Sequence, residues 1–124
     1  MHPGNILVAD ANADYRDLLC HYLDRLKYPS PIQAKNGRDA LSMALSQEPG
    51  LIIMEPCLPC LNGFEIVARL RSHPRMRHAW MAAATAMALP GDREKCLQRG
   101  FDAYLAKPFT MKEFEELLLA ASAA

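Results

Sequence analysis

The chain has 124 residues, enough for one domain with a hydrophobic core, and we expect a single domain over residues 1–124. Its 14 basic and 14 acidic residues give a formal net charge of zero, so nothing favours nucleic acid or an acidic membrane surface as a partner. The apolar runs are too short to span a bilayer, no signal-peptide pattern is present, and the four cysteines do not resemble a secreted disulfide framework. We therefore expect a cytoplasmic domain.

Apolar strands and amphipathic helices alternate through the first half of the chain. A short apolar run at 5–9 ends at Asp10, and a helix follows in which apolar residues recur at helical spacing through residue 26. The stretch 32–35 predicts a weak strand, and because prolines precede it we expect it at an edge of the sheet. A helix around 40–45 ends at 49–50, and the apolar run 51–54 then predicts a buried strand that ends at Glu55.

The same alternation continues to the C-terminus. We predict a helix at 64–71, a strand at 80–84 that ends at Thr85, and a helix from 92 that ends near Gly100. A short strand at 102–106 ends at Lys107, and a capping-box pattern at 110–113 begins the last helix. Five apolar strands alternating with five helices predict a parallel sheet covered by helices on both faces, a doubly wound α/β fold.

Four of the predicted strands end on a side chain capable of chemistry: Asp10, Glu55, Thr85 and Lys107. Because the C-terminal ends of parallel strands share one edge of the sheet, we expect these side chains to converge on one pocket. Two carboxylates, a hydroxyl and an ammonium group suit a site that holds a phosphoryl group and a divalent cation. The alternative is that each is only the polar residue that a strand needs where it meets solvent.

Several ordered segments resemble one family. They are 6–10, Pro59 with 62–65, 84–86, 91–96 and 100–109, and the spacing between the four strand-end residues agrees as well. On these segments the chain resembles a receiver domain of two-component response regulators, and 91–96 is similar to receivers attached to hybrid histidine kinases. The resemblance implies a flavodoxin-like (βα)5 sandwich with strand order 2-1-3-4-5. It also implies a signalling module of a phosphorelay, with no enzymatic activity of its own.

The family's functional positions can be transferred residue by residue. In the family an aspartate accepts a phosphoryl group from a partner histidine, and nearby acids hold Mg²⁺. The resemblance assigns the phosphoacceptor position to Glu55, the phosphate pocket to Thr85 and Lys107, and the switch aromatic to Tyr104. It assigns the metal to Asp10, Glu55 and the backbone carbonyl of Cys57, and it implies a cis peptide bond between Lys107 and Pro108. The implied partners are a histidine kinase, a phosphotransfer domain or a neighbouring output domain, or a second copy in a homodimer. They would bind through the fourth helix, the fifth strand and the last helix.

Two positions depart from the family pattern. Glu55 stands at the acceptor position in place of aspartate, and Ala11 stands in place of the second acid of the pair. A carboxylate one methylene farther out is misplaced for in-line transfer, and Mg²⁺ tolerates little change in its octahedral oxygen ligands. We therefore expect a pseudo-receiver with weak Mg²⁺ binding, in which Glu55 contacts Lys107 or Thr85 and holds one signalling state without phosphorylation. The rival hypothesis is a pocket still phosphorylated by a histidine kinase with Mg²⁺.

A hypothesis of another class rests on Cys57 and Cys60, which form a C-x-x-C motif after a predicted strand. A reactive thiol of this kind usually lies at a helix N-terminus, but residues 61–63 intervene here before the next helix. A zinc site would need a second ligand pair at metal spacing, and none is present in the sequence. The alternative to thiol-redox chemistry is that both cysteines are small residues that pack the loop.

Overall fold

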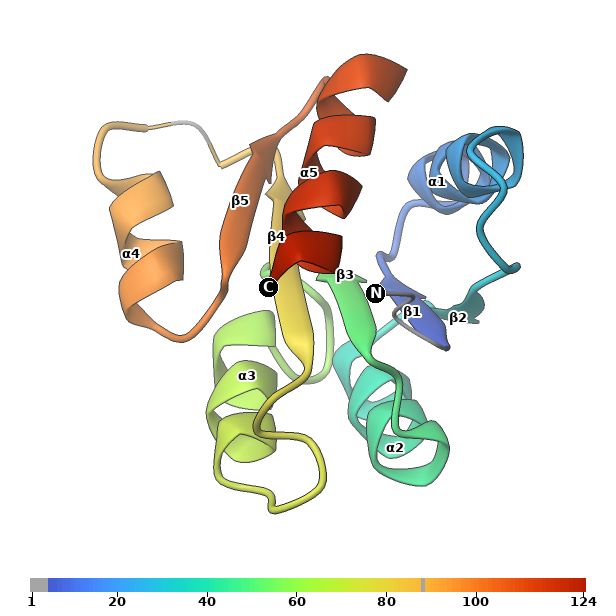
Figure 1. Ribbon diagram of the computed structural model, residues 1–124. Helices are drawn as coiled ribbons and strands as arrows, with labels where there is room; N and C mark the ends of the chain where they lie inside the picture. Colours follow the sequence, from blue (N-terminus) through green and yellow to red (C-terminus); the bar gives the residue numbers. More distant parts are fainter. Residues whose placement is uncertain (1–4, 88) are drawn as a thin grey trace.

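The computed structural model describes residues 5–87 and 89–124, and the description below concerns these residues. Five parallel strands form one sheet in the order β2-β1-β3-β4-β5; helices α1 to α4 connect them, and α5 follows the last strand (Figure 1). The strands are β1 (Ile6–Ala9), β2 (Ile32–Ala34), β3 (Leu51–Met54), β4 (Trp80–Thr85) and β5 (Ala103–Ala106). The helices are α1 (Ala13–Arg25), α2 (Gly37–Gln47), α3 (Gly63–Arg71), α4 (Asp92–Gln98) and α5 (Met111–Ala123). The predicted fold and strand order are confirmed.

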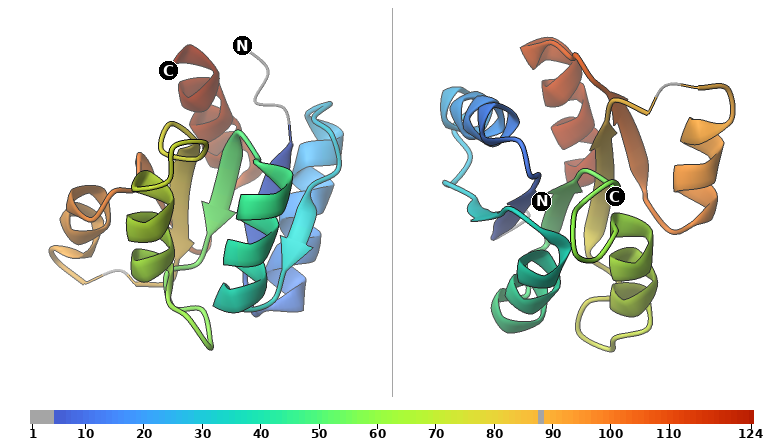
Figure 2. Two further views of the ribbon diagram at one scale, coloured as in Figure 1. Left: turned by 90° about the horizontal axis from the view of Figure 1, so that it is seen from below. Right: turned by 180° about the vertical axis from the view of Figure 1, so that it is seen from behind.

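Helices cover both faces of the sheet, with α1 and α5 on one face and α2, α3 and α4 on the other (Figures 1 and 2). The alternation of side chains along a strand divides the core accordingly. In β1, Leu7 faces the core under α2 and α3, while Val8 faces the core under α1 and α5. Because both faces are covered, the central strands β1 and β3 are buried at every residue, which explains their continuous apolar sequence.

Side-chain caps begin four of the five helices. Asn12, Asn36 and Asn62 accept backbone N–H groups at the starts of α1, α2 and α3, and Thr110 and Glu113 complete the predicted capping box of α5. Helix α4 has no side-chain cap and follows Gly91, whose φ of 92° is in the left-handed region that favours glycine. The caps place each helix start directly after a loop at the C-terminal edge of the sheet, where the candidate site lies.

The ends of some elements differ from the prediction. Strand β2 ends at Ala34 and not at 35, and β5 begins at Ala103 and not at 102. Just before β5, the Asp102 N–H donates to the Met81 carbonyl at 2.7 Å, and the Asp102 carboxylate accepts hydrogen bonds from the Met81 N–H and from Arg71. The predicted end of helix α4 is confirmed: the helix ends at Gln98 with Arg99 as its C-cap, and Gly100 follows at the C′ position with a φ of 116°.

Other expectations are less fully tested. Of the single domain predicted over 1–124, residues 1–4 and 88 lie outside the described residues. No helix in the described part of the chain is long and apolar enough to cross a membrane.

Candidate functional site

Three of the four predicted strand-end residues meet at the C-terminal edge of the sheet. The Lys107 ammonium nitrogen Nζ lies 2.6 Å from Asp10 Oδ2 and 3.4 Å from Glu55 Oε1. The three side chains are only 7%, 6% and 13% exposed, respectively. Because so little water surrounds these charges, their mutual interactions are screened far less than those of a surface ion pair.

The strands position these residues through the backbone. The Asp10 N–H donates to the Ala34 carbonyl, and the Glu55 N–H donates to the Ala9 carbonyl, at 3.0 and 2.9 Å. The Lys107 N–H likewise donates to the Thr85 carbonyl at 2.9 Å. Each site residue therefore continues the hydrogen-bond pattern of the sheet one residue past its strand, which fixes where its side chain begins.

Backbone donors satisfy the carboxylate oxygens that Lys107 does not contact. The Asn12 N–H donates to Asp10 Oδ1 at 2.9 Å, and the Cys57 N–H donates to Glu55 Oε2 at 3.1 Å. Pro56 has no N–H, so Cys57 supplies the first backbone donor after Glu55. All four carboxylate oxygens of Asp10 and Glu55 therefore already have a donor within the protein.

Two residues at this site were not found from the sequence. The Arg16 guanidinium donates to the Asp10 backbone carbonyl at 2.7 Å, and the Lys107 ammonium lies 4.1 Å from the centroid of the Tyr15 ring. Both come from the first turn of α1, whose start is set by the Asn12 cap. The only sequence signal was their position within one turn after that cap, and this does not reveal which way the side chains turn.

Thr85 lies at the same edge but bonds to a different partner. Its side chain is buried, and Oγ1 accepts the Met87 N–H at 3.1 Å. Within residues 5–87 and 89–124, the Thr85 hydroxyl makes no hydrogen bond to the side chain of Glu55 or Lys107, although the Thr85 backbone carbonyl accepts the Lys107 N–H. Of the two alternative partners predicted for Glu55, Lys107 is the one that it contacts.

Tyr104, the predicted switch residue, lies half-buried on β5. Its hydroxyl donates to the Met87 backbone carbonyl, so the backbone of Met87 connects Thr85 on β4 to Tyr104 on β5. Burial is the main cause that raises the pKa of the Tyr104 phenol, which keeps the hydroxyl a proton donor near neutral pH. Its role as a switch stays a prediction.

The two cysteines of the C-x-x-C motif are both free and exposed, so the expectation that they pack the loop is wrong. Cys57 Sγ lies 3.5 Å from Met87 Sδ. Partial burial, followed by the negative charge of Glu55, raises the pKa of the Cys57 thiol. A redox thiol needs a lowered pKa, because the thiolate is the reactive form, so this environment disfavours the thiol-redox hypothesis.

The residues assigned to a metal do not form a set of three acidic, thiol or imidazole ligands. No group of three or more His, Cys, Asp or Glu side chains that could hold a metal ion occurs in the described ranges. At the predicted site only Asp10 and Glu55 supply carboxylates, and Ala11 supplies none. The predicted role of the Cys57 backbone carbonyl is not tested by this geometry. The predicted cis peptide bond between Lys107 and Pro108 is present.

Comparison with known proteins identifies the family. The family described as "Response regulator receiver domain" matches residues 6–119. The polar-differentiation response regulator DivK of Brucella anthropi is 31% identical over 116 residues, which are 94% of this chain and 94% of that protein.

Solved structures agree with the sequence comparison. The receiver domain of sensor histidine kinase PA1611 from Pseudomonas aeruginosa PAO1, with magnesium coordinated in its active site cleft, is 32% identical, and its TM-score is 0.88 over 98% of each chain. A putative response regulator from Chloroflexus aurantiacus J-10-fl has the same fold, with a TM-score of 0.90 at 24% identity over 98% of this chain and 99% of its own. The match over almost the whole chain and the convergent strand ends lead to one conclusion: this chain belongs to the response regulator receiver domain family of two-component signalling.

Proposed function

We propose that this receiver domain signals through protein contacts without being phosphorylated. The observation that supports the proposal is the contact of the Glu55 carboxylate with the Lys107 ammonium, 3.4 Å away in a nearly closed pocket. In the family that lysine holds an oxygen of the phosphoryl group. Glu55 thus supplies negative charge to Lys107 from within the chain, and this contact favours one signalling state without phosphorylation.

The charge balance of the pocket supports this proposal. Asp10 and Glu55 carry two negative charges, and Lys107 carries one positive charge close to both. A receiver with a second acid at position 11 would carry one more negative charge, which repulsion makes costly without a cation. Ala11 removes that charge, so the pocket is closer to neutral and has less need of Mg²⁺.

The donor set also fits Mg²⁺ poorly. Mg²⁺ requires near-octahedral oxygen ligands at about 2.0–2.1 Å, normally including one or two carboxylates free to coordinate it. Here every oxygen of Asp10 and Glu55 accepts a hydrogen bond from Lys107, Asn12 or Cys57. An incoming ion would have to displace those donors, and Ala11 offers no oxygen in exchange. We therefore infer that Mg²⁺ binds weakly.

Phosphoryl transfer to Glu55 is disfavoured by geometry. Glutamate is as good an oxygen nucleophile as aspartate, but its carboxylate is one methylene farther from the backbone. A displacement on the order of 1 Å can reduce the rate of an oriented transfer about 10²-fold. The phosphorylated, Mg²⁺-dependent alternative remains the rival to be tested, because the 32% identical receiver of PA1611 is described with magnesium in its cleft.

The surface proposed to contact partners consists of α4, β5 and α5, as in the family. Leu89, in the loop before α4, is 75% exposed, and Leu119 on α5 is 60% exposed. These are two of the three large apolar side chains that are exposed in the described part of the chain, and a partner bound to this surface would bury them. We propose a histidine kinase, a phosphotransfer domain or an output domain as the partner.

Intact mass measured after incubation with acetyl phosphate and Mg²⁺ tests the proposal. We expect no stable addition to the native chain, and the addition of one phosphoryl group to the double variant Glu55→Asp with Ala11→Asp. Calorimetric titration should likewise detect tighter Mg²⁺ binding by the double variant. Glu65→Asp, the same side-chain shortening on the exposed face of α3, serves as the control and should remain unmodified.

Two outcomes would contradict this explanation. A phosphoryl group found on Glu55 of the native chain would establish the phosphorylated alternative. A double variant that stays unmodified and still binds Mg²⁺ weakly would mean that Glu55 and Ala11 are not what prevents phosphorylation.

A further inference from the structure

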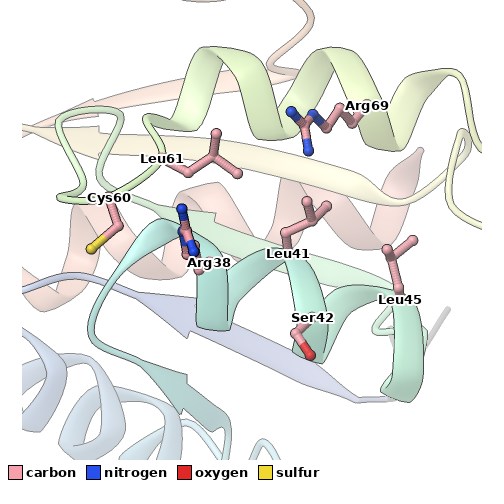
Figure 3. A pocket seen from close by; sticks show the side chains of 7 residues that line it. All are labelled: Arg38, Leu41, Ser42, Leu45, Cys60, Leu61 and Arg69. Atoms are coloured by element: carbon pink, nitrogen blue, oxygen red, sulfur yellow. The ribbon is translucent and has the colours of Figure 1, made fainter.

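A second concave site lies away from the Lys107 pocket, between α2 and α3. Its volume is about 470 Å³, within the range of small-molecule sites (Figure 3). We call it the α2–α3 pocket, and its lining residues are Arg38, Leu41, Ser42, Leu45, Cys60, Leu61 and Arg69. None of these residues has a part in the proposed receiver function.

Leucines form the apolar part of the α2–α3 pocket. Leu41 and Leu61 are partly buried at the border of the core under α2 and α3, and Leu45 is 40% exposed one turn farther along α2. Figure 3 shows the two α2 leucines in line along the helix, with Leu61 across from them on the loop before α3. Together they provide a continuous apolar surface on which a chain of methylene groups or an aromatic ring could lie.

Two guanidinium groups provide the polar part. Arg38 extends from α2 and Arg69 from α3, so positive charge stands on both walls (Figure 3). Arg38 has no ion pair in the part of the chain that the structure describes, and Arg69 has a single contact, 3.4 Å to Glu65, in which both side chains are more than half exposed. An exposed pair of this kind contributes little stability, so both guanidinium groups are available to an anion.

The loop end of the α2–α3 pocket is firmly positioned. The Gly37 N–H donates to the Pro59 carbonyl at 2.9 Å, and a Cβ at Gly37 would lie 1.6 Å from the Leu61 carbonyl oxygen. Helix α2 can therefore approach the 59–61 loop this closely only with glycine at its first position. Cys60 has a left-handed φ of 72° within that loop. A pocket held this way before binding costs less ordering when a ligand enters.

We propose that the α2–α3 pocket binds a small amphiphilic carboxylate, with its apolar body against the leucines and its carboxylate between Arg38 and Arg69. The ligand should carry a carboxylate because guanidinium groups form paired hydrogen bonds with carboxylates. The leucines favour an anion that carries an apolar body over a bare inorganic anion, because only the apolar body removes leucine surface from water on binding. The volume of about 470 Å³ favours a small molecule over a peptide segment.

Titration of the ¹⁵N-labelled chain with octanoate, observed by amide chemical shifts, tests the proposal. Octanoate should shift amides of α2, of the 60–61 loop and of α3, with a Kd on the order of a few millimolar for a ligand of this size. Acetate, which lacks the chain, and 1-octanol, which lacks the charge, should each produce much smaller shifts at equal concentrations.

Variants identify the groups responsible. Arg38→Gln and Arg69→Gln should each weaken octanoate binding about tenfold, as expected for loss of one charge-assisted contact. Leu45→Asn should weaken octanoate binding and leave the chemical shifts caused by acetate unchanged. Arg25→Gln, an exposed arginine at the end of α1, is the matched control and should bind octanoate as the native chain does.

Three results would overturn the proposal. Acetate shifts as large as those of octanoate would indicate a general attraction of anions. If Arg25→Gln weakened octanoate binding as much as the pocket variants do, the effect would come from the total charge of the chain. Shifts of the pocket amides by an acidic, apolar peptide but not by octanoate would assign the surface to a protein partner.

Discussion

The two carboxylates that contact Lys107 are predicted to contribute very unequally to stability. The Asp10 contact is 2.6 Å long and the Glu55 contact is 3.4 Å long, although both side chains are mostly buried. Asp10→Asn and Glu55→Gln each remove one negative charge while keeping the side chain almost isosteric. The difference between the stability losses of the two variants measures how much each carboxylate contributes to the interaction with the Lys107 ammonium.

The expected cost of Asp10→Asn follows from its two oxygens. Oδ2 accepts the Lys107 ammonium and Oδ1 accepts the Asn12 N–H, so both positions require an acceptor. Asparagine has one oxygen and one NH₂ group, so its NH₂ group would face either the Lys107 ammonium or the Asn12 N–H, and two hydrogen-bond donors would then oppose each other. Breaking a buried pair costs about 3–5 kcal/mol, and because Glu55 remains as a weaker partner we expect a loss of about 2–3 kcal/mol.

Glu55→Gln should cost about 0–1 kcal/mol. The glutamine oxygen can still accept the Cys57 N–H, the lost Lys107 contact is long, and the surplus negative charge of the pocket disappears. Glu65→Gln is the matched control: its contact with Arg69 is also 3.4 Å long, but the two side chains are 51% and 55% exposed. Screening by water limits its expected effect to about 0.5 kcal/mol.

Urea unfolding at neutral pH measures these differences, provided that the slope m stays constant among the variants. The reasoning would be refuted if Glu55→Gln destabilised the chain as much as Asp10→Asn. It would equally fail if Asp10→Asn cost no more than the exposed control.

Three further predictions concern other parts of the chain. Arg71→Lys should lower the free energy of unfolding by about 1.5–3 kcal/mol, because the guanidinium donates twice to the Gly100 carbonyl and once to the Ala79 carbonyl. A free energy of unfolding, measured with urea, that stays within about 0.5 kcal/mol of the native value would contradict this prediction. Asn62→Ala should cost about 1 kcal/mol through loss of the α3 cap, measured in the same way, and an unchanged midpoint would show that the cap contributes nothing. Alkylation of Cys57 by iodoacetamide should reach its half-maximal rate at a higher pH than in an unfolded peptide of residues 55–62, because burial and Glu55 disfavour the thiolate; a lower midpoint would restore the redox hypothesis.

Much of the fold could be predicted because its signals are local. Continuous apolar runs such as 51–54 indicate strands buried on both faces, and the residues Asn12, Asn62 and Thr110 mark helix starts through their own side chains. The start of β5 differs by one residue from the prediction, because the contacts at that end are tertiary. Asp102 bonds Met81 through both its backbone N–H and its carboxylate, and its carboxylate also bonds Arg71; both partners are far away in the sequence.

The candidate site was predictable only in part. Parallel strands must end at a common edge, so the neighbourhood of Asp10, Glu55 and Lys107 followed from the order of elements alone. Which atoms bond did not follow, because side-chain direction depends on the loops. Thr85 bonds to Met87 and not to Glu55, a difference that the backbone turn after β4 decides.

The sequence by itself therefore determined the alternating fold, the edge at which the site lies, and the residues Glu55 and Ala11 on which the proposed function rests. These properties depend on residue type and spacing, which the sequence states directly. Only the tertiary structure decided that Lys107 is shared unequally by two buried carboxylates, and that Arg38 and Arg69 stand on opposite walls of the α2–α3 pocket. Those features depend on distances between atoms of separate elements, which packing alone sets.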